Sequence, residues 1–241
     1  MCPITQSAPT IVGEPSVSGR GPSTWKTLPS CTFERAPTSI RWMSPRSTQL
    51  YHTLACYRRP GQAWTFYEID PEVLAYSTRG QFTFLDRCAP AAPVVIGDAR
   101  LKLVDAAPGS FDILAVDAFS SDAIPLHLLT DEAVGVYLRA LADDGLLLIH
   151  ISNRFVDLEP VLSALARERG LAAAIRDDQD SSGLEAKGLR HSRWVVLARD
   201  RAKLAELTAG AGWKPLVSPA TSVWRDDFAS ILPHLTWRKF F

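Results

Sequence analysis

Acidic side chains stand directly after three short apolar segments of this chain, with a fourth acid close behind. These acids are Glu68, Asp98, Asp117 and, in the small polar loop after Asp117, Asp122. The apolar run 113–116 is typical of a strand buried on both faces of a parallel sheet, and Asp117 ends it. Ligands of open α/β sheets bind at the carboxyl ends of the strands, so the strand-end acids should line one crevice.

Carboxylates in such a crevice can bind a nucleoside and can act on an amine. A carboxylate offers two acceptor oxygens, so Glu68 can hold the two hydroxyls of a ribose. Asp98 follows Gly97, which lets the backbone approach a ligand closely, and it can accept from the amino group of adenine. Asp117 can orient an ammonium group and take its proton, directly or through water. The alternative is that each acid only caps the helix that follows it.

Strands and helices alternate along the chain from about Thr53. The apolar segments predict strands at 63–69, 93–96, 111–116, 146–151, 171–175 and 194–198. Helices are expected from Pro71, over 130–144 and over 158–169. This alternation predicts a doubly wound α/β domain with a mainly parallel sheet. The last two strands have no helix between them, which predicts an antiparallel closing hairpin.

The overall composition argues against several classes of partner. Lys and Arg total 26, as do Asp and Glu, which removes the electrostatic argument for nucleic acid or an anionic membrane surface. No segment approaches the roughly 18 apolar residues that span a bilayer, and the start lacks a signal-peptide pattern. The four cysteines are interpreted as reduced thiols without metal-ligand spacing: Cys2, Cys31, Cys56 and Cys88. We therefore expect a cytoplasmic protein without a metal site.

Residues 1–52 differ in composition from the rest of the chain. They are rich in Pro, Ser and Thr and show no hydrophobic period, which is typical of a disordered tail. A nucleotide-binding fold of this kind should begin with a strand, a glycine-rich loop and a helix. Residues 42–52 contain no glycine and no apolar strand, and Pro45 lies where the strand should run. We interpret 1–52 as disordered or out of frame, and 53–241 as a domain that lacks its first strand and Gly-rich loop.

Several motifs, taken in order, give the chain a family resemblance. They are Tyr67-Glu-Ile-Asp-Pro71, Gly97-Asp-Ala-Arg100, Phe111-Asp-Ile-Leu-Ala-Val-Asp117 and Ser120-Ser-Asp122. From about Thr53 to Leu232 the chain resembles the spermidine synthase (polyamine aminopropyltransferase) family of polyamine biosynthesis. It is most similar to the spermidine-synthase-like domains fused behind a transporter-like region, through Asp117-Ala-Phe-Ser-Ser-Asp-Ala-Ile-Pro125, His150-Ile-Ser-Asn-Arg154 and Trp224-Arg-Asp-Asp-Phe228. The resemblance implies a Rossmann-like fold of the S-adenosylmethionine-dependent methyltransferase type.

The resemblance also implies a role for each acid. Glu68 would bind the ribose of decarboxylated S-adenosylmethionine, and Asp98 with Ala99 would bind its adenine. Asp117 would be the catalytic acid of aminopropyl transfer, with no prosthetic group. Asp122 resembles the acid that holds the amine, although two extra residues separate it from Asp117. The substrates would be a nucleoside sulfonium and a small-molecule amine, and dimers are common in the family.

Two other functions stay open at this point. A methyltransferase that uses S-adenosylmethionine could be built on the same sheet, although it would not need the acid pair Asp117 and Asp122. A non-catalytic remnant is favoured by the missing Gly-rich loop and by the lack of the N-terminal β-hairpin domain that helps the family bind its amine.

Other polar and aromatic residues have two possible roles each. His150 and Asn153 could face the crevice or be structural. Trp224, Asp226 and Asp227 could close the site or anchor the C-terminal segment.

Overall fold

The computed structural model describes most of the chain after residue 57, together with one earlier strand. The described residues are 39–44, 56, 58–117, 125–153, 155–178, 192–209 and 212–236. Cys2, Cys31, Asp122 and the segment 45–55, where a Gly-rich loop would be expected, lie outside them.

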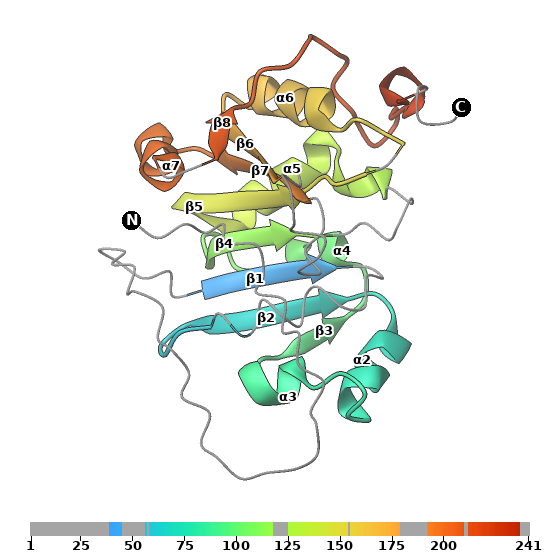
Figure 1. Ribbon diagram of the computed structural model, residues 1–241, viewed down its shortest axis with the longest axis vertical. Coiled ribbons are helices and arrows are strands. Elements are labelled where there is room, and N and C mark those ends of the chain that lie inside the picture. Colours follow the sequence, from blue (N-terminus) through green and yellow to red (C-terminus); the bar gives the residue numbers. More distant parts are fainter. Residues whose placement is uncertain are drawn as a thin grey trace.

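An eight-stranded sheet runs through the described part of the chain in the order β3-β2-β1-β4-β5-β7-β6-β8 (Figure 1). Its strands are β1 (Ser39–Ser44), β2 (Ala63–Glu68), β3 (Val94–Ile96), β4 (Phe111–Val116), β5 (Leu141–His150), β6 (Ala172–Asp178), β7 (Ser192–Ala198) and β8 (Trp213–Pro215). Strands β1 to β5 pair in parallel. Strand β7 is antiparallel to β5 and β6, and β8 is antiparallel to β6. The predicted doubly wound α/β fold with an antiparallel closing hairpin is confirmed.

Strand β1 lies in the middle of this sheet, where the sequence predicted that the first strand was missing. It pairs with β2 on one side and β4 on the other, so that Trp42 is opposite both Phe66 and Ala115 in the register. Pro45 follows the strand instead of interrupting it. The prediction of a missing first strand is therefore wrong. The assignment of the preceding residues to an out-of-frame segment stays a prediction.

Helices pack against both faces of the sheet (Figure 1). They are α2 (Pro71–Thr78), α3 (Phe84–Cys88), α4 (Ala99–Val104), α5 (Asp131–Ala140), α6 (Glu159–Glu168) and α7 (Arg201–Thr208), with the short 3₁₀ helices η1 (Leu126–Leu128) and η3 (Leu232–His234). The side chains of Asp70, Thr130 and Asp200 accept backbone N–H groups in the first turns of α2, α5 and α7. None of the described helices is long and apolar enough to cross a bilayer.

The core has two sides because side chains alternate along each strand. Leu114 of β4 and Leu147 of β5 belong to the large cluster that α5 and α6 cover. Ala115 and Leu148, one residue later on each strand, pack on the opposite side with the residues of α2 and α3. The central strands are therefore buried on both faces, as a continuous apolar run predicts.

Two boundaries differ from the sequence prediction. Helix α5 ends at Ala140, not near 144, because β5 begins at once with Leu141. The pairing of β4 with β5 shifts register between Phe111 and Ile113, which accommodates this early start. A Cβ atom at Gly145 would lie 2.9 Å from the carbonyl oxygen of Ala142, so this irregular stretch needs a glycine. Helix α7 and strand β8 had no counterpart in the prediction.

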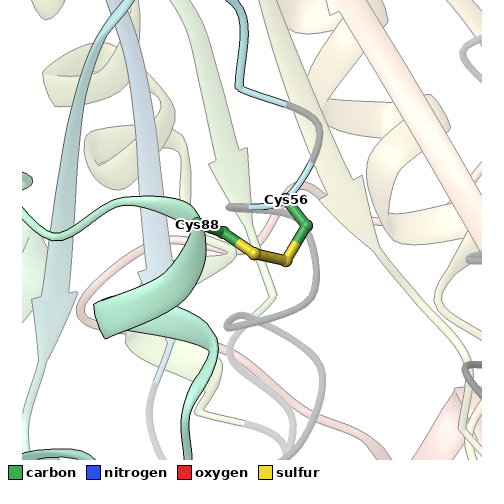
Figure 2. The surroundings of a disulfide bond; sticks show 2 residues. All are labelled: Cys56 and Cys88. Atoms are coloured by element: carbon green, nitrogen blue, oxygen red, sulfur yellow. A yellow bond between two sulfur atoms is a disulfide. The ribbon is translucent and has the colours of Figure 1, made fainter. Parts of the chain in front are cut away.

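A disulfide bond joins Cys56 and Cys88 (Figure 2). Cys88 is the last residue of α3, and Cys56 precedes β2 in the sequence. The prediction of reduced thiols is therefore wrong for this pair. Its 32-residue separation gives no local signal, since the two cysteines meet only when α3 folds back beside the segment before β2.

Candidate active site at the strand ends

Asp117 follows β4 at the carboxyl edge of the sheet and is almost completely buried, with 2% of its surface exposed. Its Oδ1 atom lies 2.7 Å from Nδ1 of His150, the last residue of the neighbouring strand β5. Its Oδ2 atom is buried, and no described residue forms a hydrogen bond with it. A buried carboxylate oxygen without a donor is costly, so this atom is suited to bind a donor supplied by a ligand.

Glu68 ends β2, on the other side of β1 from Asp117. It is 5% exposed, and its Oε1 atom accepts the backbone N–H of Asp70 at 2.9 Å. Asp70 in turn caps α2, so the turn after β2 fixes the Glu68 side chain. Because neighbouring strands are about 4.8 Å apart, the ends of β2 and β4 lie about 10 Å apart across β1. At that separation, one ligand could contact both Glu68 and Asp117.

Asp98 caps α4 and also contacts a histidine. Its Oδ1 atom accepts the backbone N–H of Leu101 at 3.0 Å, and its Oδ2 atom lies 3.0 Å from Nε2 of His127. One oxygen of Asp98 thus caps the helix, as the alternative interpretation expected, and the other contacts a histidine; adenine binding by Asp98 stays a prediction. Gly97 has a φ of +130°, a backbone conformation that requires glycine. Ala99 is the first residue of α4 and packs against the main core.

The short helix η1 holds His127 beside Asp98. The hydroxyl of Tyr137, which is fully buried on α5, donates to the carbonyl oxygen of Leu128 at 3.1 Å. Burial raises the pKa of Tyr137, so the hydroxyl keeps its proton and remains a donor. Nothing in the sequence pointed to His127, because it lies 29 residues from Asp98.

Arg100 ties α4 to the C-terminal segment. Its two terminal nitrogens donate to the two carboxylate oxygens of Asp226 at 2.7 and 2.6 Å, and Nη1 also donates to the carbonyl oxygen of His127 at 2.7 Å. The hydroxyl of Thr130 donates to Asp226 at 2.7 Å. These hydrogen bonds, Arg100 first, lower the pKa of Asp226 to about 2. Trp224 is 1% exposed, so these contacts anchor the segment.

No protein-family model and no curated protein matches the chain. Among solved structures, a probable spermidine synthase from Corynebacterium glutamicum ATCC 13032 aligns with a TM-score of 0.55 and 20% identity, over 81% of this chain and 75% of that chain. The chain has a spermidine synthase-like fold. A spermidine synthase from Thermotoga maritima aligns with a TM-score of 0.46 and 13% identity, over 71% of this chain and 56% of that chain.

His150 has partners for both ring nitrogens and for its ring face. Its Nε2 atom lies 2.6 Å from Oγ of Ser152, and its ring stacks on Trp194 with centroids 4.8 Å apart. His150 thus lies beside Asp117 at the carboxyl edge of the sheet, and both of its ring nitrogens have partners, so the two roles that the sequence left open stay open. Asn153 instead uses its Oδ1 atom to accept the backbone N–H groups of Phe155 and Val156.

The remaining predicted site residue is Asp122, which lies outside the described residues, so its pairing with Asp117 stays a prediction. Within the described ranges, no group of three or more His, Cys, Asp or Glu side chains could hold a metal ion.

Proposed function

We propose that this spermidine synthase-like domain is an aminopropyltransferase that moves an aminopropyl group from decarboxylated S-adenosylmethionine to an amine. The observation that carries the proposal is the state of Asp117. One of its oxygens is bound by His150, and the other is buried without a described hydrogen-bond partner at the edge where ligands of such sheets bind. An ammonium group is a donor of the right charge for that oxygen.

The proposed reaction needs a base that removes a proton from the amine. An alkyl amine has a pKa of about 10, so it arrives protonated and without a free lone pair. Oδ2 of Asp117 accepts the hydrogen bond of the ammonium group and takes a proton from it, directly or through water. The amine lone pair then forms a C–N bond to the carbon beside the sulfonium. The C–S bond breaks, and its electron pair stays on sulfur, which becomes a neutral thioether.

The nucleoside would lie across the ends of β2 and β3 in this proposal. Glu68 would accept the ribose hydroxyls, and Asp98 would accept the adenine amino group beside Ala99. Support comes from the burial of Glu68 and from the placement of the two acids at the ends of β2 and β3. His127 already shares the Oδ2 atom of Asp98, so adenine binding would require the imidazole to move or to share that oxygen.

Calorimetric titration combined with a turnover assay tests this function. The ligands are methylthioadenosine, decarboxylated S-adenosylmethionine and S-adenosylmethionine, with a panel of diamines as acceptors. In Asp117→Asn we expect nucleoside affinity to be kept and aminopropyl transfer to be lost. Asp144→Asn, an exposed acid at the start of β5, is the matched control and should be fully active.

Three results would overturn the proposal. Binding of S-adenosylmethionine with methyl transfer and no aminopropyl transfer would make the protein a methyltransferase. Binding of none of the three nucleosides would leave a non-catalytic remnant. Full transfer activity in Asp117→Asn would remove Asp117 from the reaction.

A further inference from the structure

Asp117, His150 and Ser152 form a row of three hydrogen-bonded side chains. Oδ1 of Asp117 lies 2.7 Å from Nδ1 of His150, and Nε2 of His150 lies 2.6 Å from Oγ of Ser152. The backbone N–H of Arg193 donates to the same Oγ atom at 2.8 Å. The row therefore begins at the strand next to β5 and ends at the buried acid.

One arrangement of protons satisfies every hydrogen bond of this row. The Oγ atom of Ser152 accepts from Arg193, so its own proton is free to be donated to Nε2 of His150. A neutral imidazole that accepts at Nε2 carries its proton on Nδ1. That proton points at Oδ1 of Asp117, which as a carboxylate oxygen can only accept.

We propose that His150, oriented by Ser152, is the positioning residue that holds Asp117 ready for the amine. This inference rests on the proposed function. The Nδ1–H group binds Oδ1 and so directs the unpartnered Oδ2 toward the substrate. In this arrangement a neutral imidazole donates to Asp117 without cancelling the negative charge that attracts an ammonium group. Trp194, stacked on the ring at an interplanar angle of 28°, keeps the imidazole in that plane.

The same three residue types form the catalytic triad of serine hydrolases, but the geometry here opposes that use. A nucleophilic serine attacks with a lone pair of Oγ, while histidine takes its proton. In this domain the Arg193 backbone N–H binds Ser152 Oγ and withdraws electron density from it. Ser152 is thus suited to orient His150 rather than to attack a substrate.

Two substitutions of His150 distinguish the roles of its two ring nitrogens. In His150→Asn the amide nitrogen takes the place of Nδ1 and can still donate to Asp117, whereas in His150→Gln it lies one bond further out, near the place of Nε2. Misplacing a catalytic group by about 1 Å costs about 100-fold in rate. We expect kcat to fall about 100-fold in His150→Ala and His150→Gln, with KM for the nucleoside unchanged. His150→Asn should recover at least tenfold of the loss.

A merely structural histidine would give a different result. Its loss would lower the thermal stability of all three variants together and would not distinguish Asn from Gln. Equal kcat values for the Asn and Gln variants, or a wild-type kcat for His150→Ala, would overturn the positioning role.

The tautomer of His150 provides a second test that needs no turnover. Nitrogen-15 NMR of the ligand-free protein distinguishes the two imidazole nitrogens, and the signals that vanish in His150→Asn belong to His150. We expect the proton on Nδ1. If the wild type shows this tautomer but transfers no aminopropyl group, the proposed function fails alone. If the protein is active but the proton is on Nε2, the positioning role fails alone.

Discussion

Replacing Asp226 by Asn tests how strongly the C-terminal segment is held to α4. Asp226 accepts two hydrogen bonds from Arg100, at 2.7 and 2.6 Å, and one from Thr130 at 2.7 Å. Together they lower its pKa from the ordinary 3.8 to about 2. Each tenfold change in acidity is worth about 1.4 kcal/mol. The Asp226 side chain is 46% exposed, however, so solvent screening reduces the net contribution to about 1 kcal/mol.

The sign of the pH dependence follows from the direction of this pKa change. Because the pKa is lower in the folded state, the Asp226 carboxylate stabilises the fold fully above its unfolded pKa near 3.8. That contribution is lost as the pH falls toward the folded value of about 2. Asp226→Asn should therefore lower the free energy of unfolding by about 1 kcal/mol at neutral pH, and its difference from the wild type should shrink below pH 3.8.

Urea unfolding at neutral pH and at a series of acidic pH values measures this difference. Asp227→Asn is the matched control, since it makes the same chemical change at the neighbouring, exposed residue. The reasoning is refuted if the two variants have equal stability at neutral pH. It is also refuted if the Asp226→Asn deficit stays constant as the pH falls through the range in which Asp226 titrates.

Two further predictions concern the disulfide and the ribose acid. Reducing the Cys56–Cys88 bond, which closes a loop of 32 residues, should lower the free energy of unfolding by about 3–4 kcal/mol, measured by urea unfolding with and without reductant. A Cys88→Ser variant should show the same loss and no further response to reductant; a response in that variant would contradict the assignment. Glu68→Gln should weaken methylthioadenosine binding by about 10- to 150-fold in calorimetry, since a hydrogen bond to a charged group is worth about 1.5–3 kcal/mol. Unchanged affinity would exclude Glu68 from the nucleoside site.

The sheet could be predicted wherever a strand carries its own apolar pattern. The run 113–116 marked β4, and Pro71 and Thr130 marked the starts of α2 and α5. Strand β1 escaped prediction because its apolar residues are interrupted by Arg41 and surrounded by Pro, Ser and Thr. Its backbone groups are paired by β2 and β4, which are distant in sequence, and local periodicity does not report such partners.

The acids of the candidate site could be predicted at the strand ends, and His150 and Asp226 could be named as candidates, but the residues with which they pair could not be predicted. Parallel strands end at one edge, so three acids after three apolar segments were expected to lie together. The partners come from far along the chain. Asp226 is 126 residues from Arg100, and His150 is 33 residues from Asp117. These pairs form only when the chain folds, and no spacing in the sequence predicts them.

Arg100 links the stability of the domain to the proposed adenine position. It directly follows Asp98 and Ala99, binds the carbonyl oxygen of His127 and holds Asp226. His127 in turn contacts Asp98. Weakening the Arg100–Asp226 pair would therefore also loosen Arg100 and His127, which lie beside Asp98. If Asp98 binds adenine, Asp226→Asn should change the affinity for methylthioadenosine as well as weaken the fold, whereas an Asp98 that only caps α4 would leave that affinity unchanged. Measuring both quantities on one variant therefore separates a binding role of Asp98 from a capping role.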